Sequence, residues 1–456
     1  MGEGWSMENK HNTTVYIVHC VDTEGPLYEE KSVPFDMVKN IFGIEIEQSD
    51  ENLKRLQKAQ IDLNGLEKEV AKVVDPHRIT TRGNWEEIDN MLALVTSEKF
   101  RSELPDSDGN SWIFNWFCMA HEGFTGVNPR RRVKGYHTIA DHYRDLIKKQ
   151  NSNDFIGFHY HPVSISGNYN DSGTAYWGEV NLNEILCHAV IDRGWFPAAF
   201  RPGFHTERPD SNWFLEQWIP FDYANQAMKE DAEGQTDLAN GRFGDWRFAP
   251  TEWRPYHPDY DNYQISGNCR RWIARCLNMY ARTRQISQQD VNDAFSDARK
   301  FGKSILAFTD HDYKDMEYEI TRVRNMIRDA SEKYPEVKFI YSNAVDAIRD
   351  CMELEYEQFH MSVEVIEDGP RKYLDVKVDK DIFGPQPYLA IRTKDGRYIW
   401  ENMDFYKIGR EWTYSFDNNT ILLEDVVAIG IAANNKCGYT NVQVLKDGII
   451  EEYNYN

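Results

Sequence analysis

The sequence predicts an α/β protein: a distorted (β/α) barrel of about seven strands, followed by a C-terminal all-β domain of sandwich type. Short apolar runs alternate with segments of helical periodicity as far as about residue 350, which favours the barrel. Titratable side chains follow several of these runs, as expected where parallel strands end at one rim. After Met352 short alternating segments and Asp-Gly turns at 395–396 and 447–448 indicate antiparallel strands.

The apolar runs and the periodic segments between them give the order of the elements. Strands of the barrel are expected at residues 15–21, 112–119, 155–161, 198–204, 304–309 and 337–341. Helices are expected at residues 85–94, 138–149, 182–193, 212–218, 288–301 and 318–334. Strands of the C-terminal part are expected at residues 373–378, 388–392 and 421–432. The alternation of strand and helix in the first part favours parallel strands that are covered by helices.

Three parts of the chain follow from this change of pattern. Residues 1–14 are expected to be a flexible N-terminus, residues 15–352 the barrel, and residues 353–456 the β domain. Within the barrel, residues 27–78 are expected to form a helical insertion, because residues 36–74 are highly charged and have helical periodicity. We expect the role of this insertion to be structural.

Charge and composition exclude several classes of partner. Lys and Arg number 52 against 74 Asp and Glu, which gives a formal net charge of −22. A chain this acidic repels nucleic acid and anionic membrane surfaces at long range. The sequence contains no run of about 18 apolar residues, so no membrane span is predicted. The formation of a homo-oligomer stays open on these grounds.

The cysteines and the first residues predict a cytoplasmic protein. The seven cysteines are scattered, odd in number and absent from any Cys-x-x-Cys pair, which argues against a disulfide framework. The N-terminal residues lack the apolar core of a secretory signal peptide. Aromatic residues make up 13% of the chain, which suits either a large core or the stacking of flat rings on a ligand.

Four strand ends carry the residues from which we infer a site, and the first contains two carboxylates. Asp22 and Glu24 follow the apolar run 15–21 and share one side of the chain if the strand continues. Carboxylates placed in this way could divide the roles of metal ligand and general base. The ordinary alternative is that they cap the segment that follows.

The second strand end contains two histidines at alternate positions, His159 and His161. Alternate side chains of a strand point to the same face, so the two imidazoles are placed to bind one cation. A lone histidine is more often a satisfied core residue, but a His-x-His pair after an apolar run favours a metal site. Zn²⁺ is the first choice, and Co²⁺, Ni²⁺ and Fe²⁺ accept the same ligands.

The third and fourth strand ends offer an arginine and a histidine. Arg201, beside a proline and a glycine, could hold a carboxylate of the first motif in its ionised state. His311 lies between Asp310 and Asp312, and either could orient its imidazole and raise its basicity, as a general acid requires. The ordinary alternatives are a strand-end ion pair for the arginine and a surface cluster for the histidine.

The order of these motifs resembles that of the polysaccharide deacetylases, the NodB-homology family or carbohydrate esterase family 4. The matching segments are Asp22-x-Glu24-Gly, His159-x-His161-Pro, Arg201-Pro-Gly-Phe and His311 after a late apolar strand. The resemblance covers roughly residues 15 to 350. It implies a distorted barrel of about seven strands with a divalent metal held by one carboxylate and two histidines. It also implies an aspartate base paired with an arginine, and a histidine acid.

Carried over by position, three residues match the catalytic groups and three match the metal ligands. Asp22 matches the base, Arg201 the residue that orients it, and His311 the acid. The metal ligands that match are Glu24, His159 and His161. The family usually has adjacent aspartates and His-x-x-x-His, so the two carboxylates could exchange roles here, and one of the histidines could lie outside the metal site.

The resemblance implies a metal-dependent hydrolase that removes N-acetyl or O-acetyl groups from a carbohydrate. The cytoplasmic prediction favours a step in the biosynthesis of a surface polysaccharide. Trp177, Trp253 and Tyr256 lie in long segments between strands and could bind the N-acetylated sugar or oligosaccharide, with packing in the core as the ordinary alternative.

Two other functions are weighed against the deacetylase. An amidohydrolase-type metal hydrolase also binds metal through a His-x-His pair on a barrel strand. A carbohydrate-binding scaffold that has lost catalysis would explain the departures from the family pattern. The β domain could bind sugar, mediate oligomerisation or brace the barrel.

Overall fold

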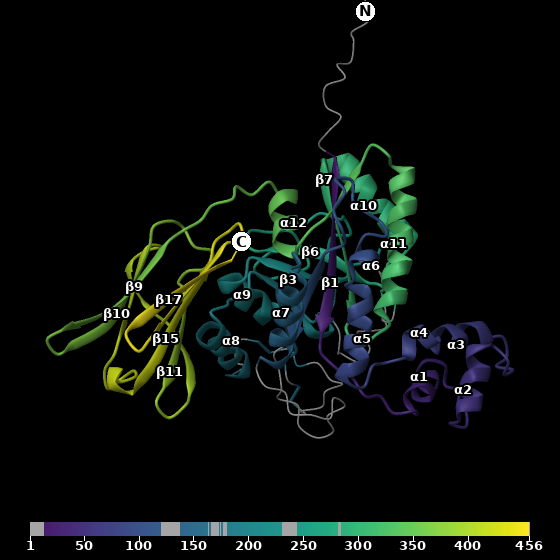
Figure 1. Ribbon diagram of the computed structural model, residues 1–456, viewed down its shortest axis with the longest axis horizontal. Helices are drawn as coiled ribbons and strands as arrows, with labels where there is room; N and C mark the ends of the chain where they lie inside the picture. Colours follow the sequence, from purple (N-terminus) through teal and green to yellow (C-terminus); the bar gives the residue numbers. More distant parts are fainter. Residues whose placement is uncertain are drawn as a thin grey trace, which may run out of the picture.

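The computed structural model describes residues 13–119, 137–162, 164–165, 173, 175–176, 180–229, 244–280 and 284–455. In this part of the chain, seven parallel strands form a closed barrel with one additional strand, and antiparallel sheets form a C-terminal β domain (Figure 1). The predicted fold class is confirmed. The expected flexible N-terminus lies outside the described residues except for residues 13 and 14, and the second of these begins the first strand.

The barrel closes because its first strand pairs with both the second and the seventh. Its strands are β1 (Thr14–Thr23), β2 (Phe114–Met119), β3 (Phe155–Tyr160), β4 (Ala199–Pro202), β5 (Phe221–Asn225), β6 (Trp272–Asn278) and β7 (Lys303–His311). The additional strand, β8 (Lys338–Tyr341), pairs with the first half of β1, and β2 pairs with the second half. All these pairings are parallel, so the carboxyl ends of the strands share one rim.

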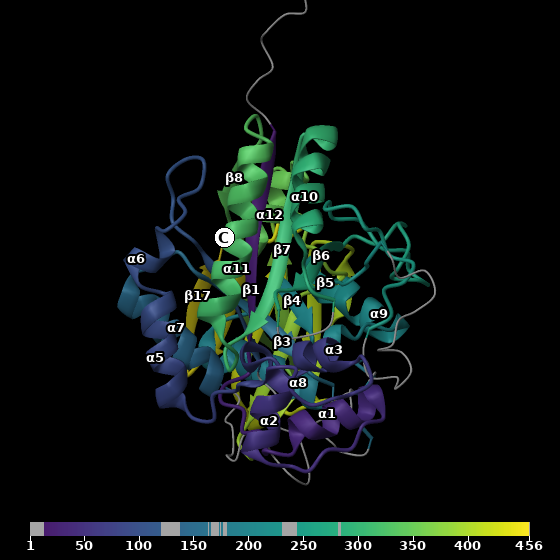
Figure 2. The ribbon, with the colours of Figure 1, turned by 90° about the vertical axis from the view of Figure 1, so that its right-hand side faces the viewer.

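Helices cover the outside of the barrel. They are α5 (Trp85–Val95), α6 (Glu98–Arg101), α7 (Thr138–Gln150), α8 (Val180–Arg193), α9 (Pro209–Trp218), α10 (Gln288–Phe301), α11 (Met316–Lys333) and α12 (Ala344–Cys351). Figure 2 shows α10 and α11 over β7 and β1, on the side away from the β domain. The sequence predicts most of the strands and helices of the barrel, but it does not predict β5, β6, α6 or α12.

The side chains of β1 alternate between two apolar clusters, one outside the barrel sheet and one inside it. Ile17 and Val21 belong to the outer cluster, where they pack with the covering helices. Val18 and Cys20 belong to the inner cluster, together with residues of β5, β6, β7 and α12. Because side chains of a strand alternate, Asp22 continues the inward-facing series and reaches the barrel interior near its carboxyl rim.

Four short helices follow β1, where the sequence predicts a helical insertion. They are α1 (Val33–Phe42), α2 (Asp50–Gln57), α3 (Glu67–Val73) and α4 (Pro76–Ile79). The first three share a small core, and the four helices form a separate group at the lower right of Figure 1, near the carboxyl end of β1. Hydrogen bonds join this segment to the loop after β7, from the Arg82 backbone N–H to the Tyr313 carbonyl (2.9 Å) and between His77 and Asp315 (2.7 Å).

Two antiparallel sheets form the β domain. One has the order β13-β14-β10-β9, and the other has the order β12-β11-β15-β16-β17. The strands are β9 (Met361–Asp368), β10 (Arg371–Val378), β11 (Tyr388–Thr393), β12 (Tyr398–Glu401), β13 (Asp404–Lys407), β14 (Glu411–Ser415), β15 (Val426–Asn434), β16 (Thr440–Lys446) and β17 (Ile449–Tyr455). Side chains from both sheets share one core, as in a sandwich. We propose that the boundary between the barrel and the β domain lies between residues 352 and 353.

The five-stranded sheet packs directly on helix α8 of the barrel. Ile429 and Ile431 of β15 face the core of the sandwich, whereas Ala432 belongs to the cluster that contains α8. Gly430 lies so close to the helix that an added Cβ would come within 2.5 Å of Val190 Cγ1. The backbone of β15 therefore approaches α8 more closely than any side chain would allow, and the two parts of the chain share a continuous apolar interface.

A buried ionic network joins β5 and β6 to the loop after β4. Arg271 contacts Glu207 (Nη2 to Oε2, 2.7 Å) and Asp222 (Nη1 to Oδ2, 2.6 Å), and all three side chains are buried. Asn212 of α9 accepts a third hydrogen bond from the guanidinium through Oδ1 (2.7 Å). One arginine thus compensates two carboxylates that are excluded from water.

We predict that Arg271→Ala lowers the free energy of unfolding by about 3–5 kcal/mol, because it leaves two buried carboxylates without a cation. Arg299→Ala is the control, since Arg299 pairs with Glu336 on the surface (3.0 Å). This exposed pair is expected to contribute less than about 1 kcal/mol. Urea unfolding of the two variants measures the difference, and equal losses would contradict the role given to the buried network.

Candidate metal centre

Six of the predicted site residues come together at the carboxyl rim of the barrel. They are Asp22, Glu24, His159, His161, Arg201 and His311, and all six are buried. Strand register brings four of them together in pairs: Asp22 lies opposite His311 across β1 and β7, and His159 lies opposite Arg201 across β3 and β4. These residues are far apart in sequence, so the closure of the barrel creates the cluster.

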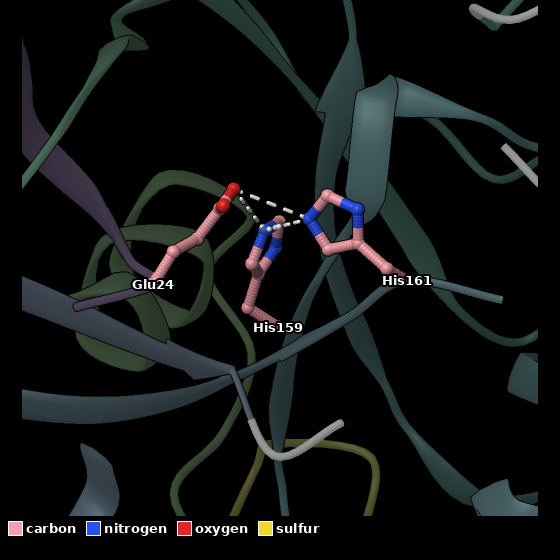
Figure 3. A group of neighbouring side chains, drawn as sticks. All are labelled: Glu24, His159 and His161. Atoms are coloured by element: carbon pink, nitrogen blue, oxygen red, sulfur yellow. Dashed lines mark hydrogen bonds and ion pairs between the residues drawn. The ribbon is translucent and has the colours of Figure 1, made fainter. Parts of the chain in front are cut away.

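Glu24, His159 and His161 direct one ligand atom each toward a common point (Figure 3). The two histidine Nε2 atoms are 2.9 Å apart, and Glu24 Oε1 lies 3.2 Å from His161 Nε2 and 3.7 Å from His159 Nε2. Both imidazoles reach the same side, as the His-x-His alternation predicts, although β3 ends at Tyr160. The three side chains form a group that can hold a metal ion.

The protonation of His159 follows from its other ring nitrogen. Nδ1 lies 3.0 Å from the backbone carbonyl oxygen of Arg201, and a carbonyl can only accept a hydrogen bond. Nδ1 therefore carries the proton, and in the neutral imidazole Nε2 presents a lone pair to His161 and Glu24. A hydrogen bond of this type orients a histidine that binds metal, so the donor set fits a divalent cation.

Arg201 holds Asp22 through two parallel hydrogen bonds. Nε donates to Oδ1 (2.7 Å) and Nη2 donates to Oδ2 (3.0 Å), and the guanidinium also donates through Nη1 to the Tyr223 carbonyl (2.5 Å) and Cys276 Sγ (3.0 Å). Burial raises the pKa of Asp22, but the charge and the hydrogen bonds of Arg201 outweigh burial and hold this pKa well below its usual value. The carboxylate of Asp22 is therefore ionised.

His311 faces the carboxylate of Asp22 in β1 and that of Glu24 just after this strand. Its Nε2 lies 4.0 Å from Asp22 Oδ2 and 3.9 Å from Glu24 Oε1. The aspartates expected to orient this ring have other contacts: Asp310 Oδ1 lies 3.0 Å from His19 Nε2 on the outer face of β1, and Asp312 bonds the backbone after β1. Alternation along β7 explains the difference, since residues 310 and 312 point away from the face of residue 311.

Asp312 has a role that the sequence does not reveal. Its Oδ1 and Oδ2 accept hydrogen bonds from the backbone N–H groups of Glu24 (3.1 Å) and Gly25 (2.8 Å). The hydroxyl of Tyr143 in α7 donates to the same carboxylate (2.9 Å). Asp312 thereby fixes the turn that carries Glu24 toward the histidines. The position of Asp312 after an apolar strand marks it as a candidate site residue in the sequence. Its contact with the turn after β1 is known only from the structure.

The segment after β4 forms a wall against His161. An added Cβ on Gly203 would lie 2.3 Å from Cγ of the His161 ring, so only glycine fits there without displacing the imidazole. The next two residues have positive φ angles, 52° at Phe204 and 50° at His205, which non-glycine residues rarely adopt. The Phe204 ring meets the imidazole of His161 edge to face, with centroids 5.0 Å apart.

In the part of the chain that the structure describes, no contact links the aromatic residues predicted to bind substrate with this cluster. Trp253 is fully buried, and the Arg275 guanidinium lies 4.3 Å from the centroid of its ring. Tyr256 is also buried, and its hydroxyl donates to the Tyr263 carbonyl (2.6 Å). Trp177 lies outside the described residues. Their binding role stays a prediction.

Comparison with known proteins leaves the family open. No protein-family model matches the sequence, and no curated protein matches it. Among solved structures, the crystal structure of Puue Allantoinase is similar, with 12% sequence identity and a TM-score of 0.35 over 76% of this chain and 92% of that one. Values this low establish neither family nor function. The fold and the site define a parallel barrel protein with a candidate metal centre at its carboxyl rim.

Among the helices of the described residues, none combines the length and the apolar character needed to cross a bilayer.

We predict that Gly203→Ala costs the protein about one equivalent of bound Zn²⁺ at near-stoichiometric metal, because the new methyl group displaces His161. Gly83→Ala is the matched control, since an added Cβ there meets only Tyr28 Cδ2 at 3.7 Å, which is ordinary contact. Metal analysis after equilibration against a competing chelator gives the stoichiometry. An unchanged zinc content in Gly203→Ala would contradict the assignment of His161 as a ligand.

Proposed function

We propose that the protein is a metal-dependent hydrolase that cleaves an amide C–N bond. One observation carries the proposal: an ionised aspartate, held by Arg201, lies beside a Glu-His-His group whose lone pairs converge. His159 Nδ1 is 3.7 Å from Asp22 Oδ1, so the carboxylate borders the metal group directly. This arrangement supports the activation of a water molecule next to a polarised carbonyl.

The roles of the residues follow from their positions. A divalent cation bound by Glu24, His159 and His161 would polarise the substrate carbonyl and lower the pKa of water. Asp22 accepts a proton from the attacking water, because Arg201 keeps its carboxylate ionised. His311 donates a proton to the departing amine nitrogen as the C–N bond breaks. The products are a carboxylic acid and a free amine.

For the substrate, we propose an N-acetylated carbohydrate, with an O-acetylated one as the ester counterpart. The order of the four motifs along the chain supports this class through the resemblance to the polysaccharide deacetylases. The seven cysteines are free and buried, which supports a cytoplasmic role in the biosynthesis of a surface polysaccharide. Zn²⁺ is the metal we propose, with Co²⁺, Ni²⁺ and Fe²⁺ as substitutes.

A small amide, as in amidohydrolase-type enzymes, is the second candidate substrate. The observation that favours it is the burial of Trp253 and Tyr256, which leaves a sugar-stacking surface without these two rings. A small amide needs only the metal group, the base and the acid. The same residues would then act on a different acyl compound, and assays can separate the two substrates.

Substrate assays decide between these functions. Zinc-loaded protein is incubated with N-acetylglucosamine oligosaccharides, with an acetylated sugar ester and with a cyclic amide such as hydantoin. Acetate release from the oligosaccharides is the result expected for the deacetylase, and ring opening is expected for the second candidate. Binding of the sugars without any hydrolysis would favour the carbohydrate-binding scaffold and contradict the proposed function.

We predict that Asp22→Asn lowers kcat by about 10²–10⁴-fold on the active substrate, because an amide cannot accept the proton of water. Asp310→Asn is the matched control. This buried aspartate is adjacent in the sheet, paired with Val21, but contacts His19 on the outer face of β1. It is expected to retain kcat within a few fold. Equal activity of Asp22→Asn and wild type would exclude Asp22 as the base.

A further inference from the structure

A second group of histidines and a carboxylate lies between the barrel and the β domain. His137 precedes the first turn of α7, and His188 and Asp192 are one turn apart on α8. Asp192 Oδ2 lies 2.7 Å from His188 Nδ1 and 3.2 Å from His137 Nε2. The ligand atoms of all three lie within 4.8 Å of one another, as in the Glu24 group at the rim.

Tyr398 of the β domain completes this group. Its ring stacks on the His188 imidazole, with centroids 3.6 Å apart and planes inclined by 23°. Its hydroxyl donates to Asp192 Oδ1 (2.7 Å), which leaves Oδ2 directed at both imidazoles. A tyrosine from β12 therefore fixes the carboxylate that two barrel helices present, in the manner of the partners that orient metal ligands.

We propose that His137, His188 and Asp192 bind a second divalent cation, with Zn²⁺ as the best fit, and that this ion fastens α7 and α8 to the β domain. Two imidazoles and a carboxylate are ligands that zinc prefers. The i, i+4 spacing on α8 places two of them on one face. The three side chains are 14–19% exposed, so a water molecule can complete a tetrahedral shell around the ion.

The surroundings of the group suit a structural ion. Beside the group, Arg193 of α8 donates two hydrogen bonds to Asp141 of α7 (2.8 and 2.7 Å). Helix α8 also packs against the five-stranded sheet, so an ion here would join α7 to α8 at the place where α8 meets the β domain.

Zinc stoichiometry tests the proposal on the full-length chain. Metal-free protein is titrated with Zn²⁺ in competition with a chromophoric chelator. Wild type is expected to bind about two equivalents, and His161→Ala and His188→Ala about one each. His142→Ala is the control, because His142 also lies on α7 and pairs with an aspartate, Asp89 (3.1 Å), outside the group. It is expected to bind two.

A second measurement isolates the new site. In the His161→Ala protein, Zn²⁺ is expected to raise the melting temperature, and adding His188→Ala or His137→Ala removes that rise. Tyr398→Phe in the same background is expected to weaken binding by about 10–100-fold, since Asp192 loses its orienting bond. Two equivalents bound by His188→Ala, or none by His161→Ala, would overturn the proposal. Neither result depends on hydrolytic activity.

Discussion

The candidate site depends on one buried ion pair, between Arg201 of β4 and Asp22 of β1. These strands are not neighbours in the barrel, so the pair spans its interior. Burial of both charges is offset because the guanidinium also donates to a carbonyl and to a thiol, so that each of its three nitrogens has an acceptor. The backbone carbonyl of the same arginine orients His159. One residue thus keeps Asp22 ionised and sets the tautomer of a proposed metal ligand.

Strand alternation explains why much of the site could be predicted from sequence. Because side chains alternate along a strand, the side to which each residue of a short strand points is fixed. Asp22, His159 and His161 could therefore be predicted to contribute to one site. The same rule separates His311 from its aspartate neighbours, although we expected those neighbours to orient it. Asp312 acts on the turn after β1 instead, and a contact between two loops has no local signature.

Two of the barrel strands that the sequence missed contain buried polar residues. Strands β5 and β6 read as FDYAN and WIARCLN, in which Asp222 and Arg275 interrupt the apolar pattern that marks a strand. Both are compensated by partners from elsewhere in the chain, Asp222 by Arg271 and Arg275 by Asp290. Ion pairs between residues distant in sequence cannot be recognised from the pattern of a single segment. Helical periodicity, in contrast, predicted α10 with its observed bounds.

The most direct test of the account is a zinc-soaked crystal measured at the zinc absorption edge. If these three residues bind the metal, an anomalous peak is expected at about 2.0–2.2 Å from Glu24 and from the Nε2 atoms of His159 and His161. Asp22 should remain on Arg201, outside the ligand set. A rim without a peak, or an ion bound to Asp22 with the arginine pair broken, would contradict the account.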